Sequence, residues 1–336
     1  MAYNRIFWAI QALGIAPHGS NTTDDSSWSA GEAITTADFV SGVQSVGITS
    51  TFNLEQVFEL GQLALYEDVE EVPDVEVTIE RVIDKHRLLY SRCAADSETA
   101  GVTISGMQNK QVDLWFSLTE DENDDAGDAN PTTVVHCSGM YMSSASFNLA
   151  TDGNLTESVT MVGNHKKWHA SPGTKIAGIA TGSEGSTGNV MRRQNVTVSN
   201  TDFYSDTGSD PKITSVTVSV DFGREQINVL GKRLPYYRYV TYPVEVTTEV
   251  EVLARGADNV DALPESNNLT ERAIAFKIGP TDPDDVVATI DLGSKNKLTS
   301  VTWGGGDTGG ANATITYSYR NFNELTVTSH SSTLSD

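Results

Sequence analysis

Cysteine and long apolar runs are both scarce in this sequence. The 336 residues contain only two cysteines, Cys93 and Cys137, which is too few for a disulfide framework, so we expect buried thiols. No stretch approaches the ~20 apolar residues that a membrane span needs. The opening residues 1–19 lack the clean apolar segment and the cleavage site of a signal peptide. We therefore expect a soluble protein that is assembled in a cytoplasm.

Basic residues are also few. The sequence has 22 Lys and Arg against 45 Asp and Glu, which gives a net charge of −23 at pH 7. A groove that binds nucleic acid tightly needs clustered Lys and Arg. The composition therefore argues against tight binding of DNA or RNA, and the same repulsion disfavours an anionic membrane surface.

Long helical runs of Ala, Leu, Lys and Glu are missing as well, whereas Thr, Ser, Val, Asn and Gly recur throughout the sequence. Such a composition favours strands over helices. Hydrophobic residues make up 38% of the chain, which is enough for a sizeable core. The length allows either two domains or one large β architecture.

What the sequence does contain is a pair of similar segments. Residues 55–82 read "EQVFELGQLALYEDVEEVPDVEVTIERV", and residues 225–252 read "EQINVLGKRLPYYRYVTYPVEVTTEVEV". Glu, Gln, Leu, Gly, Tyr and Pro recur in step at an offset of 170 residues, as from Pro73 to Pro243. After the prolines the alternating Val pattern slips by one residue. A single match of this kind could arise by chance, so the surrounding segments matter.

The neighbouring features recur in the same order in both halves. Each half has a strand containing "ITS", a charged loop, an alternating Val strand, a weakly helical stretch, and a short strand followed by an acidic loop. Two further strands then surround a turn, "TDGN" at 151–154 and "GGGDTGG" at 304–310. The best helix candidate is 85–111, although Gly and β-branched residues weaken it. The shared order predicts an internal duplication.

These features divide the chain into four expected segments. They are an N-terminal arm at 1–45, a β domain at 46–169, a Gly/Ser/Thr-rich linker or loop at 170–190, and a second β domain at 191–336.

The repeated unit resembles the tail tube proteins of tailed bacteriophages. The resemblance is carried by "LGQ" at 60–62, "VPDVEVTIERVID" at 72–84 and "SASFNLATDGNLTESVTMVGN" at 144–164, and it covers roughly 46–165 and 212–330. It implies a mainly β fold with two tandem tail-tube-type β-sandwich or barrel domains, each with a short flanking helix. On assembly, such domains would form a β-barrel that runs around the whole ring.

The resemblance also implies a role and partners. The chain would be a structural subunit of the virion tail, without catalysis or cofactor, that forms stacked rings around an acidic channel for genome ejection. Two units per chain imply trimeric rings that give a pseudo-hexameric tube, with a hexamer as the alternative. Further partners would be a terminator, a hub and, in a contractile tail, a sheath. Ring closure removes open strand edges, and an acidic wall repels DNA that passes without tight binding.

Two corresponding loops carry opposite charge. Loop 67–76 is acidic, whereas its counterpart at 232–242 is basic and aromatic. We hypothesise that they form contacts between subunits, within a ring or between rings, and that reversing Arg233 and Arg238 to Glu abolishes assembly. The alternative is that both are simply solvated loops. The candidate contact residues are Glu67, Asp68, Glu70, Glu71, Asp74, Lys232, Arg233, Tyr236, Tyr237, Arg238, Tyr239 and Tyr242.

The sequence gives little support for a metal-binding, phosphate-binding or catalytic site. A zinc site from His136, Cys137, His165 and His169 lacks a second Cys pair. The acidic segment 121–132 has its Gly one place late for a calcium loop and no final Glu. The Gly-rich stretches lack the Lys-Ser/Thr of a phosphate loop. We expect no catalytic, cofactor-binding or metal-binding residues.

Two alternative functions remain open. One is a tail hub or distal-tail protein with the same fold. The other is a β-rich carbohydrate-binding adhesin that uses the aromatic residues between Tyr236 and Tyr242. Electron microscopy separates them, since a tube protein forms long hollow tubes, a hub forms discrete rings and a binding module stays monomeric.

Overall fold

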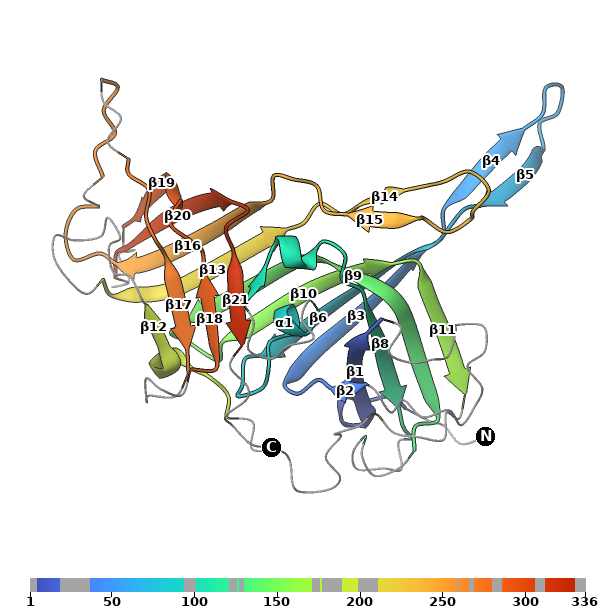
Figure 1. The fold of residues 1–336 in the computed structure, drawn as a ribbon, viewed down its shortest axis with the longest axis horizontal. Helices are drawn as coiled ribbons and strands as arrows, with labels where there is room; N and C mark the ends of the chain where they lie inside the picture. Colours follow the sequence, from blue (N-terminus) through green and yellow to red (C-terminus); the bar gives the residue numbers. More distant parts are fainter. Residues whose placement is uncertain are drawn as a thin grey trace.

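The computed structural model is mainly β, as the composition predicts (Figure 1). The expected linker at 170–190 lies almost entirely outside the residues described. The structure describes residues 5–18, 37–93, 101–120, 126, 130–170, 176, 189–198, 211–258, 260–265, 269–279, 286–305 and 312–329.

Eight antiparallel strands form one continuous central sheet. Most of them alternate apolar with polar residues, so that one face of the sheet is buried and the other faces solvent. In order across the sheet, the strands are β19 (Lys297–Gly304), β20 (Thr314–Phe322), β16 (Glu245–Leu253), β13 (Ile213–Asp221), β9 (Thr133–Ala150), β10 (Thr156–Gly163), β6 (Asp74–Val82) and β3 (Val43–Thr51).

Further strands form a smaller sheet in each half. In the first half, the beginning of the long strand β9 leaves the central sheet and pairs with two strands of this second sheet. Residues 11–17, within the expected N-terminal arm, form β1 and pair along the whole of β8. The order in the first half is β11 (His165–Ala170), β9, β8 (Val112–Leu118), β1 (Gln11–Pro17) and β2 (Asp38–Phe39). The order in the second half is β21 (Thr326–Ser329), β18 (Ala288–Asp291), β17 (Ala275–Ile278) and β12 (Val196–Val198), and β7 (Val102–Thr103) of the first half pairs with the outer side of β21.

Two hairpins extend from the central sheet (Figure 1). They are β4 (Leu54–Phe58) with β5 (Leu65–Glu70), and β14 (Glu225–Ile227) with β15 (Tyr237–Tyr239). The interpretation of 67–76 and 232–242 as loops was therefore wrong in part, because both stretches contribute a strand. Charge alone suggested a solvated loop, but a two-stranded ladder satisfies its backbone without burying either face.

Helix is scarcer than the sequence suggested. Within the described residues of the candidate at 85–111, which are 85–93 and 101–111, only α1 (Leu89–Arg92) and the 3-10 turn η2 (Ser105–Met107) are helical. The second expected flanking helix, at 256–271, is wrong for the described residues 256–258, 260–265 and 269–271, none of which is helical. The other turns are η1 (Trp8–Ile10) and η3 (Arg193–Asn195). Among the residues described, no helix has the length and apolar character that a membrane crossing requires.

The two halves of the central sheet pair their strands in the same order. The first half reads β3-β6-β10-β9 and the second reads β13-β16-β20-β19. The smaller sheets correspond too, with β11-β9-β8-β1 matching β21-β18-β17-β12. Four strand positions of each smaller sheet thus correspond, whereas β2 beside β1 and β7 beside β21 have no counterpart among the described strands.

The irregularities of the sheet also correspond. One extra residue interrupts the ladder of the first strand in each half, Gln44 in β3 and Thr214 in β13. Another extra residue interrupts the fourth strand, Ser143 in β9 and Thr299 in β19. β-Bulges bend a strand and fix its register, so the shared positions give both halves the same local geometry.

Candidate assembly surfaces

The middle of the sheet, where β9 pairs with β13, joins the two halves of the chain. Phe147 of β9 lies opposite Val218 of β13, and both side chains are completely buried. The ring of Tyr90 from α1 packs on Phe147 with 6.0 Å between centroids. This central junction, β9 with β13, is therefore an ordinary piece of protein core.

Arg224 of the second half forms hydrogen bonds with the backbone of the first half. Its guanidinium donates hydrogen bonds to the carbonyl oxygens of Met107 at 2.7 Å, Gln108 at 2.9 Å and Met142 at 2.9 Å. The same group lies 5.2 Å from the centre of the Tyr141 ring. Burial lowers the pKa of Arg224 to about 10, yet the side chain stays charged at neutral pH.

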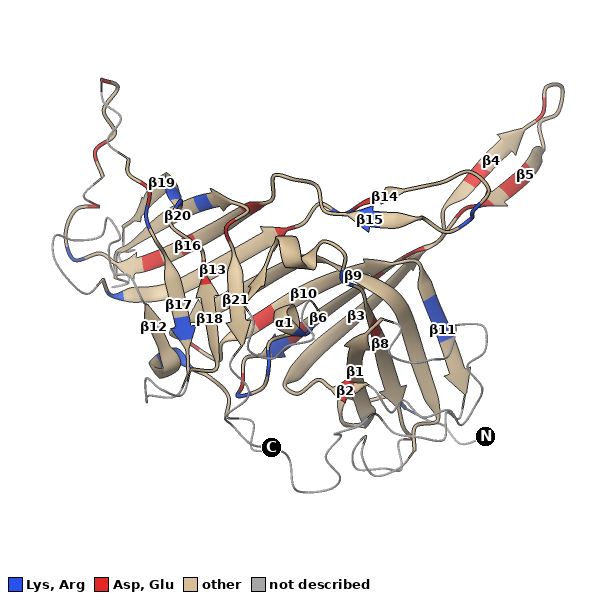
Figure 2. Cartoon of the chain, viewed as in Figure 1, with Lys and Arg blue, Asp and Glu red and all other residues tan. Residues whose placement is uncertain are grey.

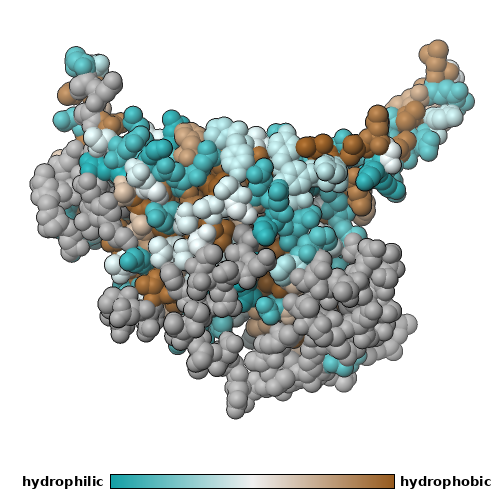
Figure 3. Space-filling model, in the orientation of Figure 1, coloured by the Kyte–Doolittle hydropathy of each residue, from teal (hydrophilic) through white to brown (hydrophobic). Residues whose placement is uncertain are grey.

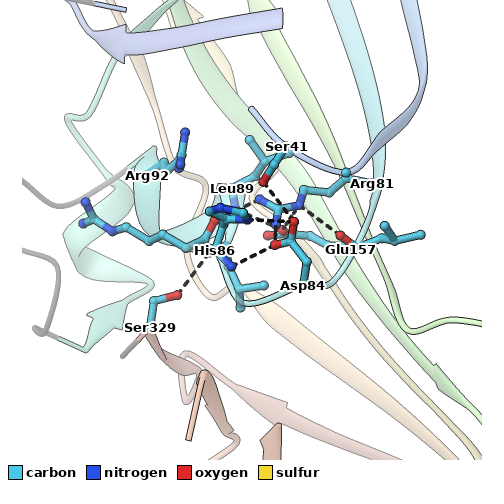
Figure 4. Close-up of polar contacts among 12 residues, drawn as sticks. Ser41, Arg81, Asp84, His86, Leu89, Arg92, Glu157 and Ser329 are labelled. Atoms are coloured by element: carbon cyan, nitrogen blue, oxygen red, sulfur yellow. Dashed lines mark hydrogen bonds and ion pairs between the residues drawn. The ribbon is translucent and has the colours of Figure 1, made fainter. Parts of the chain in front are cut away.

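A buried ionic network lies beneath the first half of the sheet (Figure 4). Arg81 is completely buried, and its Nη2 donates to Asp84 Oδ1 at 2.7 Å. Arg81 Nε lies 4.0 Å from Glu157 Oε2. Glu157 in turn accepts hydrogen bonds from the backbone N–H groups of Leu89 at 2.9 Å and Tyr90 at 2.8 Å. The network therefore fixes α1 to the sheet.

The two carboxylates of this network shift in opposite directions. Burial would raise the pKa of Asp84, but the hydrogen bond from His86 and the charge of Arg81 outweigh it and lower the pKa. For Glu157, burial prevails over Arg81 and the two backbone donors, so its pKa is raised. Breaking a buried pair leaves an uncompensated charge, which makes this network sensitive to substitution.

The network also reaches the second half of the chain. The backbone N–H of Leu88 donates to Ser329 Oγ of β21 at 3.1 Å (Figure 4). Beside it, β21 pairs with β7 of the first half through Val327 and Val102. Sheet pairing, Arg224 and these contacts hold the two halves together as one body.

The outer strands of the central sheet, β3 and β19, each have one side on which no described strand pairs. Trp303 of β19 is 51% exposed, although it occupies the place that Phe147 occupies in the first half. Ile48 of β3 is only partly buried, whereas its counterpart Val218 is buried completely. The two edges thus expose backbone N–H and C=O groups together with apolar side chains. The corresponding groups of β9 and β13 cover each other at the central junction.

The solvent-facing side of the central sheet is polar along its whole width. Residues directly opposite each other in an antiparallel ladder lie on the same face, so the printed registers trace rows across the sheet. One such row consists of Ser45, Glu80, Ser158, Ser146, Ser219, Thr247, Arg320 and Lys297. Every side chain in this row is polar.

This polar face carries an excess of negative charge. Its basic residues on the described strands are Arg320 and Lys297, both near the β19 edge (Figure 2). Its acidic residues, which follow from the same registers and the alternation along each strand, are Asp74, Glu76, Glu80, Asp221, Glu245, Glu249 and Glu251. The polar face therefore attracts cations and repels phosphate groups.

The β4–β5 hairpin projects away from the body beyond β3 (Figure 1), and Figure 3 shows hydrophobic residues along it. Leu60 and Leu63 at its tip are fully exposed, as is Leu230 at the tip of β14–β15. Both tips turn at a glycine with positive φ, Gly61 at 93° and Gly231 at 82°, a conformation that suits glycine. Exposed apolar residues on a protruding hairpin are typical of a surface that a partner covers.

The structure brings several of the sequence-predicted contact residues together within one chain. Arg238 Nη2 lies 2.6 Å from Asp74 Oδ1 and also donates to Asn164 Oδ1 at 3.2 Å. Arg233 Nη2 lies 4.0 Å from Glu70 Oε2, with both side chains exposed. The oppositely charged segments therefore meet inside the chain, while their role between subunits stays a prediction.

The other predicted contact residues are spread along the two hairpins. Tyr237 donates to the carbonyl oxygen of Gln108 at 3.0 Å, and Tyr239 donates to Glu225 Oε2 at 2.7 Å. The exposed ones are Glu67, Asp68, Glu71, Lys232, Tyr236 and Tyr242.

Sequence reasoning missed three features that matter here. Nothing in the sequence singled out Arg224 or the edge position of Ile48. The same holds for the edge position of Trp303. A residue-by-residue alignment of the two halves matches Phe147 with Trp303 and identifies the edge strands of the sheet. That alignment requires the positions of the bulges in β9 and β19, which the structure supplies.

The residues considered for zinc lie on β9 and β11. His136 stacks on Trp115 with 4.9 Å between ring centres, and the rings of His165 and His169 lie 6.1 Å and 6.2 Å from it. Cys137 is buried, which raises its pKa to about 12. Within the described part of the chain, no three His, Cys, Asp or Glu side chains gather as ligands for one metal ion. Most of the segment 121–132 lies outside the described residues.

The comparisons with known proteins find a likeness to solved structures only at the level of a distant match. No protein-family model and no curated protein matches the chain. A chain of the anti-feeding prophage baseplate, solved by electron cryomicroscopy with six-fold symmetry imposed, matches at 10% identity and a TM-score of 0.33, covering 50% of this chain and 97% of that chain. Because the identity and the TM-score are low, the function is argued from the strands, edges and charges of the chain itself.

Proposed function

We propose that the chain is a self-assembling structural subunit of a phage tail tube, built from two tandem copies of one tube-type domain. The observation that supports this best is the arrangement of the central sheet. The strand positions that meet at the central junction are the same positions that end the sheet as β3 and β19. A sheet made this way continues from copy to copy, and closure into a ring covers both edges.

The polar face supports the proposal as well. In a closed ring one face of the sheet lines the channel, and the buried face here is already covered by α1 and the smaller sheets (Figure 1). The polar face, with its hydroxyl and carboxylate side chains, would therefore line the channel. Such a wall repels the phosphates of passing DNA over a distance of ~10 Å at moderate salt.

The number of chains per ring follows from the two halves of each chain. The resemblance to tail tube proteins implies six domain positions per ring, which three such chains would fill, so we propose trimeric rings that stack into a pseudo-hexameric tube. The chain then acts without catalysis, in the virion tail, and the ends of its tube would meet other tail proteins such as a terminator and a hub.

Negative-stain electron microscopy of the purified protein, with sedimentation velocity over a range of concentrations, tests this proposal. Long hollow tubes would support it. Discrete rings that never stack would favour a hub or distal-tail protein instead. A chain that stays monomeric at every concentration would overturn the proposal and favour a binding module.

A further inference from the structure

The interface between copies can be specified residue by residue, because the central junction supplies its pattern. This inference rests on the proposed function, since it requires that copies of the chain assemble through their sheets. The four bulge residues Gln44, Thr214, Ser143 and Thr299 align the two halves of the sheet without ambiguity. With that alignment, β3 corresponds to β13 at an offset of 170 residues, and the sheet part of β9 corresponds to β19 at an offset of 156 residues.

We propose that β19 of one copy pairs antiparallel with β3 of the next copy in the register of the central junction. In that junction Ser146 lies opposite Ser219, and Phe147 lies opposite Val218. Applying the two offsets places Thr302 opposite Thr49 and Trp303 opposite Ile48. The partner is therefore a second copy of this chain, attached through defined residues.

The exposed side chains of the two edges agree with this register. Trp303 and Ile48 would cover each other on the apolar side, as Phe147 and Val218 do in the central junction. A shift by one residue would instead place the apolar side chains of one strand on the polar face.

The backbones have room to approach. The same register places Gly304 of β19 opposite Gly47 of β3. A Cβ atom at Gly47 would have no neighbour within 4 Å, and one at Gly304 would touch only Thr314 of its own sheet at 3.4 Å and beyond. No side chain of either strand therefore obstructs the pairing at this point.

The projecting hairpin gives an independent indication of the same partner. In the chain, β14–β15 lies back over the first half, where Arg238 reaches Asp74. The corresponding hairpin β4–β5 extends beyond β3 (Figure 1), where the proposed register places the second half of a neighbouring copy. The acidic β5 would then lie at the end of β19 and β20 that carries Lys297 and Arg320. Glu245 of β16, which occupies the place of Asp74, lies at the same end, so β5 would meet both basic and acidic side chains there.

Disulfide cross-linking tests the register directly. A chain with both Thr49→Cys and Thr302→Cys should form disulfides between copies under mild oxidation and give a ladder of covalent multimers on non-reducing gels. The native cysteines should not interfere, because Cys93 and Cys137 are buried and burial raises the pKa of both thiols. Tryptic mass spectrometry would identify the linked pair.

Two matched variants control the experiment. The pair Ser146→Cys with Ser219→Cys has the same geometry inside one chain, so it should close at monomer mobility and set the reference yield. The pair Thr49→Cys with Ser300→Cys is displaced by two residues along β19. Its yield should be at least about fivefold lower, because such diagonal positions lie ~7–8 Å apart, beyond comfortable disulfide reach.

Each outcome decides the matter. An inter-copy yield close to the internal reference supports the proposed register. Tubes or rings that form without this cross-link, or that cross-link better through Ser300, overturn the register but leave the proposed function standing. A chain that closes the internal pair yet stays monomeric overturns both. If the internal pair closes poorly, a short bifunctional thiol reagent applied to the same three variants provides the same comparison.

Discussion

Substituting two corresponding aromatic residues should separate the stability of the chain from its assembly. Phe147 lies inside the central junction with no exposure, whereas Trp303 in the corresponding position of the second half is 51% exposed. Phe147→Ala removes a fully buried ring and should lower the free energy of unfolding by about 3–5 kcal/mol. Trp303→Ala should cost the isolated chain less, because about half of the side chain is already in water.

The cost of Trp303→Ala should appear in assembly instead. Roughly 100 Å² of the indole remains to be covered by a neighbouring copy. At ~25 cal/mol per Å² this amounts to ~2.5 kcal/mol, which weakens each contact between copies about 60-fold. Phe147→Ala should leave the contacts between copies largely intact wherever the chain stays folded.

Urea unfolding under conditions where the chain is monomeric measures the first effect, and sedimentation velocity across a concentration series measures the second. The reasoning fails if Trp303→Ala assembles at the same concentration as the parent protein. It fails equally if Trp303→Ala destabilises the isolated chain as much as Phe147→Ala does.

Four further substitutions test the internal contacts. Glu157→Leu should lower the free energy of unfolding by about 3–5 kcal/mol in urea, since two buried backbone N–H groups lose their acceptor and Arg81 loses one of its carboxylates; a loss under about 1 kcal/mol would contradict this. Asp84 has a native pKa below its unfolded value of 3.8, so its carboxylate stabilises the fold above about pH 4 and this stability is lost as the pH falls through the lower native pKa. The deficit of Asp84→Asn in urea unfolding should therefore be larger near pH 5 than near pH 2.5, and an equal deficit at both would refute it. Arg238→Ala should cost about 1 kcal/mol, whereas the exposed Arg233→Ala should cost close to nothing, and equal losses would contradict the distinction.

The sequence predicted the strands that lie half-buried in the central sheet. The alternation at Val75, Val77 and Ile79 is confirmed in β6, and the turn at 151–154 is confirmed between β9 and β10. These elements were predictable because apolar residues at every second position are typical of a strand in a sheet with one face buried and the other exposed to solvent. β8 differs from these strands because both of its faces are buried, including Asp113, Trp115 and Ser117.

Other elements could not be read from local pattern. The hairpin β4–β5 has exposed residues throughout, so no burial pattern marked it in the sequence. Residues 11–17 form β1 only because β8 offers an edge about 100 residues further along the chain. The assembly edges depend on which strands end the sheet, and strand order is a property of topology that periodicity does not contain.

The bulges at Gln44 and Thr214 have a consequence for the size of an assembled tube. An extra residue at the same place in each half turns the sheet through the same angle. If successive copies join as the halves do, the wall curves evenly, and its circumference depends on how many equal arcs complete a circle. The bore of the tube would then depend on single extra residues in the strands that form its wall.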